Sequence, residues 1–194
     1  MWDERYNTEE YIYGTEPNDF LKAHFHELPK GKILCLADGE GRNSVFLAEN
    51  GYEVTAVDGS PFAVEKAKQL AEQRGVKVEN IVADLGEFDL GESQWDGIVS
   101  IFCHLPPALR QRIHAQIPKA LKPNGVFLLE SYRPEQLEYK TGGPQVAEMT
   151  ISLDNLNTEI QGLNFLMTQE TVRDVTEGSL HTGMAAVTNF IAKK

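Results

Sequence analysis

The sequence predicts an α/β fold in which a mostly parallel β-sheet carries helices on both faces. Short strand-like runs, such as residues 33–36 and 52–58, alternate with segments of helical periodicity. The run WDGIVSIFCHL at 95–105 is almost continuously apolar, as expected for a strand buried on both faces. The last third instead indicates two strands joined through TEGSLHTG (176–183), and a link that short favours an antiparallel hairpin.

The individual elements follow from local patterns. A helix is expected at 17–28, and another follows the turn at 38–41. The helix at 60–75 has Ser60 in place to cap it, Pro61 in its first turn and Gly75 at its end. The remaining predicted elements are a strand at 76–85, the strand at 95–105, a helix at 106–122 bent or interrupted near Pro118, a strand at 126–132, a helix at 152–160 capped by Ser152, and strands at 164–175 and 184–192.

Length and composition indicate one domain. The chain has 194 residues, and its hydrophobic content of 41% is sufficient for a full core. We therefore expect a single domain over residues 1–194, with residues 1–30 as an N-terminal cap segment. The polar stretch 133–150, which contains Gly142-Gly143-Pro144, is predicted to be a loop over the substrate.

The charge balance excludes some partner classes. A net charge of -11 argues against a nucleic-acid or anionic membrane partner, because such binding depends on Lys and Arg. The start MWDERYNTEE lacks the basic and apolar segments of a signal peptide, and no run approaches the roughly 18 apolar residues of a membrane span. Cys35 and Cys103 lie in apolar runs and are expected to be buried free thiols. These features predict a cytoplasmic protein with a small-molecule partner.

The segment ILCLADGEGRN (33–43) is typical of a strand that enters a glycine turn and then a helix, a place where backbone approaches a ligand closely. A dinucleotide fingerprint needs a third glycine, and Ser44 follows instead. The lysine of a phosphate-binding P-loop is also missing, and Glu40 is a poor neighbour for a pyrophosphate. The turn therefore favours a ligand without phosphate.

Acidic residues follow the predicted strands. Asp58 ends the second strand, where a carboxylate can accept hydrogen bonds from a ribose diol, and Asp84 after the third strand can accept from an exocyclic amine. Together with the glycine turn, this pattern fits an adenosine that carries a charged amino-acid tail. S-adenosylmethionine is such a molecule.

At these residues a family resemblance becomes specific. ILCLADGEGRNSVFLAENGYEVTAVDGSP resembles the first two motifs of class I S-adenosylmethionine-dependent methyltransferases. YGTEPNDFL, LADGEGRN, VSIFCHLPP, LKPNGVFLLE, TGGP and EGSLHTG, in this order, resemble the small bacterial branch related to tellurite-resistance methyltransferases. The resemblance implies a Rossmann-like seven-stranded sheet of order 3-2-1-4-5-7-6 with the last strand antiparallel, and methyl transfer to a small-molecule acceptor.

The same resemblance implies residue roles. Asp58 would bind the ribose, Asp84 and Leu85 would frame the adenine, and the glycine turn would pass under the methionine end. The implied cofactor-binding residues are Tyr13, Asp38, Gly39, Gly41, Asn43, Asp58, Gly59, Ser60, Asp84, Leu85 and Ile101. Two positions depart from the family pattern, because many members have an acid at Cys35 and a glycine at Ala37.

Methyl transfer requires a positioned nucleophile, and a base where that nucleophile arrives protonated. Four candidates lie near the carboxyl ends of the predicted strands: His104, Tyr132, Arg133 and His181. His181 falls in the hairpin link, where its ring can take a proton or, when charged, hold an oxyanion. No metal site is predicted.

Several functions stay open at this point. The acceptor is an oxyanion such as tellurite or selenite, a thiol, or a small metabolite. A non-catalytic S-adenosylmethionine-binding module and, less favoured, a nicotinamide-dependent oxidoreductase are the alternatives. A DNA N-methyltransferase is disfavoured, because Ala108 rather than an aromatic residue follows Pro106-Pro107.

Overall fold

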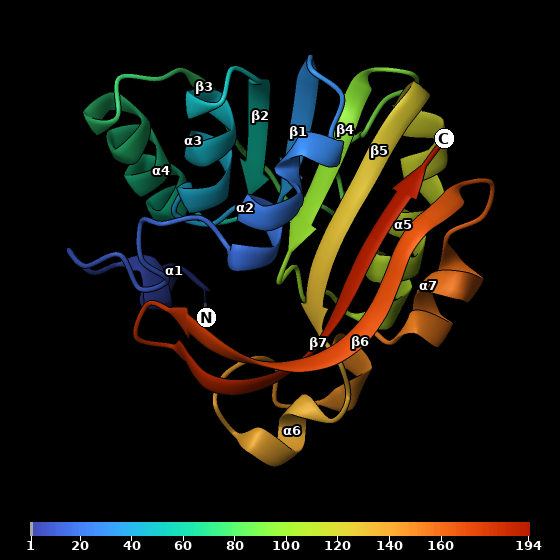
Figure 1. Cartoon of the computed structure of the whole chain (residues 1–194). Helices are drawn as coiled ribbons and strands as arrows, with labels where there is room; N and C mark the ends of the chain where they lie inside the picture. Colours follow the sequence, from blue (N-terminus) through green and yellow to red (C-terminus); the bar gives the residue numbers. More distant parts are fainter. Residues whose placement is uncertain (1) are drawn as a thin grey trace.

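A seven-stranded sheet runs through the molecule and carries helices on both faces (Figure 1). The computed structural model describes residues 2–194, with side chains from residue 3 onward. The strand order is β3-β2-β1-β4-β5-β7-β6. β7 is antiparallel to both β5 and β6, and all other pairs are parallel. The predicted fold class, strand order and antiparallel last strand are confirmed.

The elements have the following bounds. The strands are β1 (Lys32–Leu36), β2 (Glu53–Asp58), β3 (Val78–Val82), β4 (Trp95–Ile101), β5 (Leu121–Tyr132), β6 (Asn164–Glu177) and β7 (His181–Lys193). The helices are α1 (Trp2–Tyr6), α2 (Asp19–His24), α3 (Arg42–Glu49), α4 (Pro61–Gln73), α5 (Pro107–Ala120), α6 (Gln136–Tyr139) and α7 (Leu153–Glu159), with 3-10 turns η1 (Phe25–Glu27) and η2 (Ala147–Met149).

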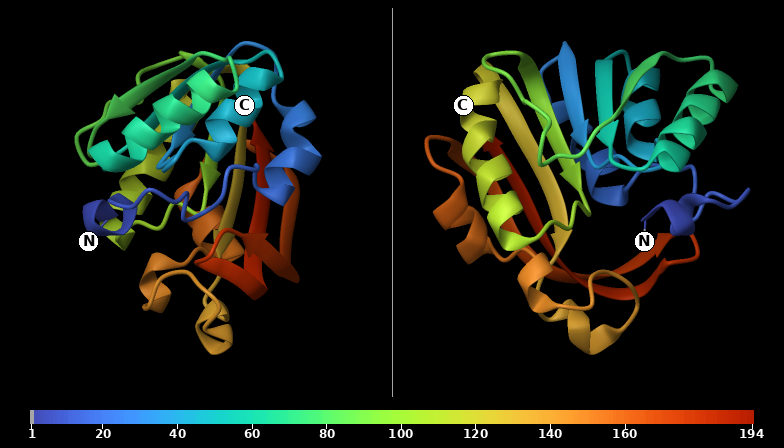
Figure 2. Two further views of the ribbon diagram at one scale, coloured as in Figure 1. Left: turned by 90° about the vertical axis from the view of Figure 1, so that its left-hand side faces the viewer. Right: turned by 180° about the vertical axis from the view of Figure 1, so that it is seen from behind.

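The sheet separates two apolar layers. Side chains alternate along β1, so Ile33 and Cys35 pack toward α2 and α3 whereas Leu34 and Leu36 pack toward α5 and α7. α4 packs beside α3 and against β3. The right view of Figure 2 shows the side opposite to that of Figure 1. Both layers are apolar, which explains why the central strands read as continuous apolar runs.

Several predicted details differ from the structure. β4 ends at Ile101 rather than at 105, because Phe102 has a φ of +50° and leaves the strand conformation. β5 begins at Leu121, five residues before its predicted start. Ser60 stands at the start of α4, but its hydroxyl donates to Asp3 Oδ1 (2.7 Å) instead of capping the helix. The predicted cap Ser152 and the two buried free cysteines are confirmed.

The hairpin link is much shorter than the sequence indicates. β6 and β7 pair up to Glu177 and His181, so only residues 178–180 form the turn. His181 is therefore the first residue of β7 rather than a turn residue. The register continues to this point because Thr176 pairs with Thr182 across the two strands, which extends the hairpin beyond the body of the sheet (Figure 1).

A buried ion cluster ties this hairpin to the rest of the fold. We use this name for Glu130, Glu177, Arg42 and Arg173. Arg173 Nη2 lies 2.5 Å from Glu130 Oε1 and 3.2 Å from Glu177 Oε1, and Arg42 Nη2 lies 2.6 Å from Glu177 Oε2. Asn18 Nδ2 donates to both carboxylates, at 2.7 and 2.8 Å. The cluster thus joins β5, β6, α3 and the start of α2.

An N-terminal strap, residues 8–14, crosses between the glycine turn and the hairpin. The carboxylate of Glu40 accepts from the backbone N–H groups of Ile12 and Tyr13, both at 3.2 Å, and pairs with Lys66 Nζ at 2.8 Å. On the other side, Ser179 N donates to Ile12 O at 2.9 Å. Glu40 is therefore occupied by the strap and by Lys66, which is its role in the turn.

Replacing Gly178 tests whether the hairpin holds the strap. Gly178 has a φ of +71°, and an added Cβ would overlap the carbonyl oxygen of Ile12. We expect Gly178→Ala to lower the free energy of unfolding by more than about 1–2 kcal/mol, the cost of a left-handed conformation for a residue with a Cβ, because the overlap with Ile12 adds to that cost. We also expect it to expose the strap to proteolysis. Urea unfolding and limited proteolysis measure both effects.

Gly162→Ala is the matched control. Gly162 has a φ of +82° and no atom within 4 Å of the added Cβ, so this variant carries the backbone term alone. Equal losses of stability in the two variants, with an intact strap, would show that the hairpin does not hold it.

Candidate active site

Two adjoining hollows lie at the carboxyl ends of the parallel strands, where α/β sheets bind ligands. The acidic chamber has a volume of about 370 Å³ and is bordered by Asp58 and Asp84. The histidine chamber has a volume of about 460 Å³ and is bordered by the glycine turn, His104 and His181. The wall residues that both chambers share are Tyr6, Ala37, Phe102 and His104.

The glycine turn forms one wall of the histidine chamber. Ala37 has a φ of +49° and Gly39 a φ of +62°, so the chain bends sharply after β1. A left-handed conformation costs an alanine about 1–2 kcal/mol, and the turn bears this strain where the family pattern has glycine. Asp38 accepts from Ser44 Oγ at 2.5 Å, and desolvation raises the pKa of its carboxyl to about 6.

Asp58 connects the turn to the acidic chamber. Its carboxylate accepts from Gly39 N and Ser60 N, both at 2.9 Å, and burial raises its pKa. Two such bonds leave acceptor capacity on the two oxygens for a ligand in the chamber. Asp84 is exposed and accepts from Gly86 N at 2.6 Å, and the buried Leu85 follows it.

His104 has a defined tautomer. Its Nδ1 lies 3.2 Å from the carbonyl oxygen of Met149, which can only accept, so Nδ1 carries the proton. The lone pair of Nε2 has no hydrogen-bond partner among the described residues. Desolvation lowers the pKa of His104 to about 4, so the ring is neutral at pH 7.

His181 lies among aromatic rings. Tyr13 is 4.6 Å away and Phe102 is 4.9 Å away between ring centroids. Its Nδ1 also has no partner within residues 3–194. Burial first, and then the positive charge of Arg42, lower the pKa of His181 to about 3. At neutral pH the ring is therefore uncharged and cannot hold an oxyanion by charge, which corrects that part of the sequence interpretation.

The polar loop after β5 closes the histidine chamber. Residues 142–146 line it together with Met149. Gly143 packs flat on Tyr132, since an added Cβ would come within 2.6 Å of that ring. Tyr132 is 1% exposed, lines neither chamber, and supports Phe102 at a centroid distance of 4.5 Å.

The structure brings most of the predicted site residues together. Those in the histidine chamber are Tyr13, Asp38, Gly39, Asn43, Ile101, His104 and His181. Those in the acidic chamber are Asp58, Gly59, Ser60, Asp84 and Leu85.

Three predicted residues, one of which is the Tyr132 described above, lie outside both chambers. Gly41 faces Ala67 of α4, where an added Cβ would lie 2.7 Å from the alanine Cβ. Arg133 pairs with Glu135 at 3.2 Å and with Glu170 at 3.8 Å, because the chain turns outward after β5.

Tyr6 and Arg42 are among the chamber residues that escaped the sequence reasoning. Tyr6 lines both chambers, and burial, aided by the charge of Asp58, raises its pKa. Arg42 is 7% exposed and lines the histidine chamber. The available signal for Arg42 was its place directly after Gly41, since a charged residue there is carried into the site by the turn.

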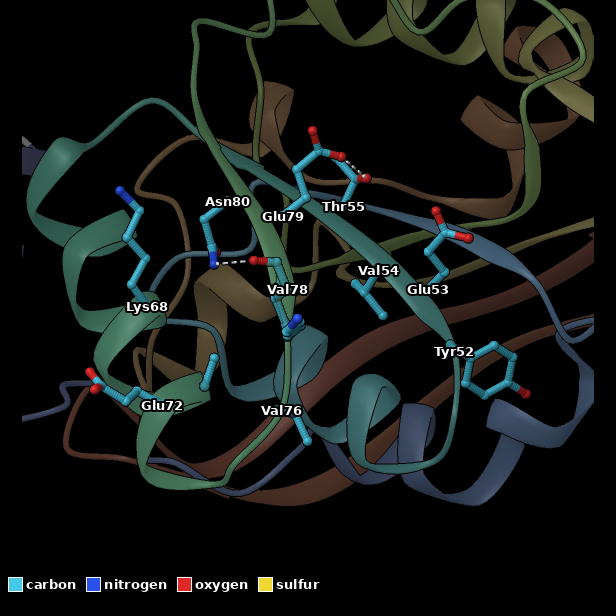
Figure 3. Close-up of a pocket in the computed structure, with 12 residues that line it drawn as sticks. Tyr52, Glu53, Val54, Thr55, Lys68, Glu72, Val76, Val78, Glu79 and Asn80 are labelled. Atoms are coloured by element: carbon cyan, nitrogen blue, oxygen red, sulfur yellow. Dashed lines mark hydrogen bonds between the residues drawn. The ribbon is translucent and has the colours of Figure 1, made fainter.

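A larger hollow of about 750 Å³ lies away from these residues, between β2, β3 and α4 (Figure 3). Some of its polar side chains pair with their neighbours: Thr55 Oγ1 donates to Glu79 at 2.8 Å, and Asn80 Nδ2 donates to Val78 O at 3.2 Å. It contains none of the unpartnered buried polar atoms found among the described residues. We therefore place the site at the two chambers.

Two searches of the described residues complete the picture. Within residues 2–194, no helix is long and apolar enough to cross a membrane. In the same part of the chain, no cluster of three or more His, Cys, Asp or Glu side chains is arranged to hold a metal ion.

Comparisons with known proteins agree with this geometry. Residues 33–125, which include the glycine turn and Asp58, match the family described as a methyltransferase domain. This match covers slightly less than half of the chain. An uncharacterized methyltransferase from Synechocystis is 35% identical over 127 residues, which cover 58% of this chain and 57% of that protein. The chain spans about half the length of the curated relatives it matches.

Solved structures show the same fold. An S-adenosylmethionine-dependent methyltransferase from Methanosarcina mazei has a TM-score of 0.72 and 18% identity, and the match covers 92% of this chain and 98% of that chain. TehB from Haemophilus influenzae has a TM-score of 0.72 and 19% identity, covering 100% of this chain and 65% of that chain. These matches agree with the predicted family, whose cofactor is S-adenosylmethionine.

The residues present fit this cofactor. The Asp58 carboxylate retains acceptor capacity toward the acidic chamber, as a ribose diol requires. The half-buried Asp38 and the backbone of the turn border the adjoining chamber, where a charged amino-acid tail finds polar groups. The two volumes, about 370 and 460 Å³, lie within the usual range of about 300–1,000 Å³ for small-molecule sites.

The lowered pKa of His181 predicts an acid-dependent loss of stability. The folded pKa of about 3 lies below the unfolded value of about 6.5, so the unfolded state binds more protons as the pH falls through this interval. Stability contributed by the neutral ring is present above pH 6.5 and is lost on acidification. Between pH 6.5 and 5.5, we expect the wild type to lose about 1 kcal/mol more than His181→Gln.

Urea midpoints measured at several pH values provide the test. His26→Gln, which replaces an exposed histidine, controls for the removal of a titratable ring, and it should follow the wild type. If the wild type and His181→Gln lose stability in parallel, His181 is protonated in the folded state as well.

Proposed function

We propose that the protein transfers a methyl group from S-adenosylmethionine to a small molecule bound in the histidine chamber. The main support for this proposal is that the two chambers meet at a shared wall, which includes Ala37, Phe102 and His104. One chamber presents carboxylates suited to an adenosine, and the other presents neutral nitrogen bases. A cofactor spanning this wall would bring its methyl group next to an acceptor.

The cofactor would be held mainly from the sheet side. Asp58 offers acceptors for the ribose, and Asp84 and Leu85 border the same chamber. Gly39 and Tyr13 line the second chamber, where the strap covers the turn. When bound, S-adenosylmethionine would supply an electrophilic methyl group. The protein then needs only to orient the acceptor, exclude water and take up a proton.

His104 is the favoured proton acceptor. Its Nδ1–H is tied to Met149 O, which leaves the Nε2 lone pair as the available base. His181, between Tyr13 and Phe102, is suited to bind the acceptor by a neutral hydrogen bond. Neutral imidazoles suit a thiol or hydroxyl acceptor better than an oxyanion. Tellurite and selenite rest on the sequence resemblance alone.

An acceptor screen tests this function. Candidate thiols, hydroxylated metabolites, tellurite and selenite are supplied with labelled S-adenosylmethionine, and release of S-adenosylhomocysteine is measured. Turnover on at least one acceptor supports the proposal. Binding of the cofactor without turnover on any of them would favour the non-catalytic binding module.

Asp58→Ala should weaken cofactor binding. Hydrogen bonds to a charged group contribute about 1.5–3 kcal/mol each, so we expect at least about a tenfold rise in the Kd for S-adenosylhomocysteine. Calorimetry measures the Kd, and Asp89→Ala is the control because its carboxylate also accepts a backbone N–H, from Gly91 at 2.9 Å. An unchanged Kd, or tighter binding of NAD than of S-adenosylhomocysteine, would contradict this placement.

Removing His104 and removing His181 should affect different kinetic constants. We expect His104→Ala to lower kcat by about 10²–10⁴-fold below the pKa of the acceptor and to recover at higher pH, where the acceptor is already deprotonated. His181→Ala should mainly raise the KM for the acceptor and leave cofactor affinity intact. A pH-dependent kcat loss in His181→Ala instead would transfer the role of base to His181.

A further inference from the structure

Arg42 has bonding capacity that the fold does not use. It is the first residue of α3 and is 7% exposed. Its Nη2 pairs with Glu177 Oε2 at 2.6 Å, whereas Nη1 has no hydrogen-bond partner among the described residues. An unsatisfied N–H of a buried charged group is costly, and such groups in folded proteins normally meet a ligand or water.

Arg42 borders the histidine chamber, and its partner Glu177 ends β6, directly across from His181 in β7. After burial, the charge of Arg42 is the largest influence that lowers the pKa of His181. The chamber thus combines one buried cation with two neutral imidazoles.

Arg42 differs from the other arginine in this chamber. Arg5 lies on α1 at the exposed N-terminal side, and its Nη1 donates to Tyr13 Oη at 3.1 Å. Arg42 is instead fixed within the buried ion cluster, and Glu177 retains Arg173 and Asn18 as further partners. A rigid, desolvated guanidinium is well suited to recognise a carboxylate.

Exposed apolar side chains line part of the chamber, beside the exposed polar residues Arg5 and Gln145. Val146 and Leu180 are 48% and 42% exposed, and both line it, together with Pro144. They come from two different segments, the loop after β5 and the hairpin turn. A small inorganic ion would leave these side chains in contact with water.

We propose that the methyl acceptor is an organic acid: an apolar body lies against Val146 and Leu180, and its carboxylate binds Arg42. The inference rests on the proposed function and names the acceptor class of the same site. The reacting thiol or hydroxyl gives its proton to His104, and the carboxylate stays ionised throughout.

A pair of matched thiols tests the carboxylate. 4-Mercaptobenzoate and thiophenol share the nucleophile and the ring, and differ in the charged group. We expect the wild type to have a higher kcat/KM for 4-mercaptobenzoate, and Arg42→Gln to lower the ratio of the two values about 10–100-fold, as the loss of a charged hydrogen bond predicts. Arg74→Gln, at an exposed arginine paired with Glu16 and Glu49, should leave the ratio unchanged.

The Kd of S-adenosylhomocysteine shows whether Arg42 binds the carboxylate of the acceptor or that of the cofactor. We expect Arg42→Gln to bind it as the wild type does. If the Kd rises instead while the ratio of the two thiols is preserved, Arg42 binds the carboxylate of the cofactor, and the proposal is overturned. A wild type without preference for 4-mercaptobenzoate would overturn it as well.

A binding measurement keeps this test independent of turnover. Ligand-observed NMR with the unreactive pair benzoate and benzamide, on protein saturated with S-adenosylhomocysteine, should show Arg42-dependent binding of benzoate only. Such binding without turnover on any thiol supports the anion site while the proposed function fails. Arg42→Lys, which keeps the charge, should retain part of the preference and serves if Arg42→Gln does not fold. Equal binding of benzoate and benzamide to the wild type would contradict the site.

Discussion

The buried ion cluster is the constraint on which the site depends. Glu130 is fully buried, and a carboxylate there is tolerated only with close partners, because desolvation of a lone charge costs several kcal/mol. Arg173 and Asn18 supply these partners, and Glu177 extends the cluster to Arg42. One set of charges thereby fixes β5, the far end of the hairpin and the start of α3. The walls of the histidine chamber cannot move apart without separating these charges.

The strap completes this enclosure from the N-terminal side. Glu40 takes two backbone N–H groups of the strap and the ammonium of Lys66, so an acid inside the glycine turn serves to cover the turn. Ser179 holds the same segment from the hairpin. Three parts of the chain that are distant in sequence therefore meet around one space. Burial of both rings beside that space explains why the two histidines are held neutral.

The neutral state of His104 and His181 limits the chemistry that the histidine chamber supports. An imidazole that is uncharged at pH 7 accepts a proton or a hydrogen bond, and it does not attract an anion by charge. The positive charge of the chamber instead resides on arginine, which stays protonated when it is buried. Proton transfer and charge recognition are thus separated between different side chains. This division agrees with a methyl acceptor that has both an acidic proton and a permanent charge.

The sequence by itself determined the sheet and its helices, and it predicted residues that border the acidic chamber. The spacing of apolar residues and the continuous apolar runs identify the strands. The place of residues such as Asp58, at a strand end and near the glycine turn, is enough to predict that they border the site. The acceptor side was only partly predictable. Arg133 follows a strand as Asp58 does, yet it pairs outward with Glu135, whereas Arg42 is carried inward by the turn. Only the tertiary structure decided this, because the direction of a side chain near the hairpin is set by long-range pairing of β6 and β7 and by buried charges from three separate segments.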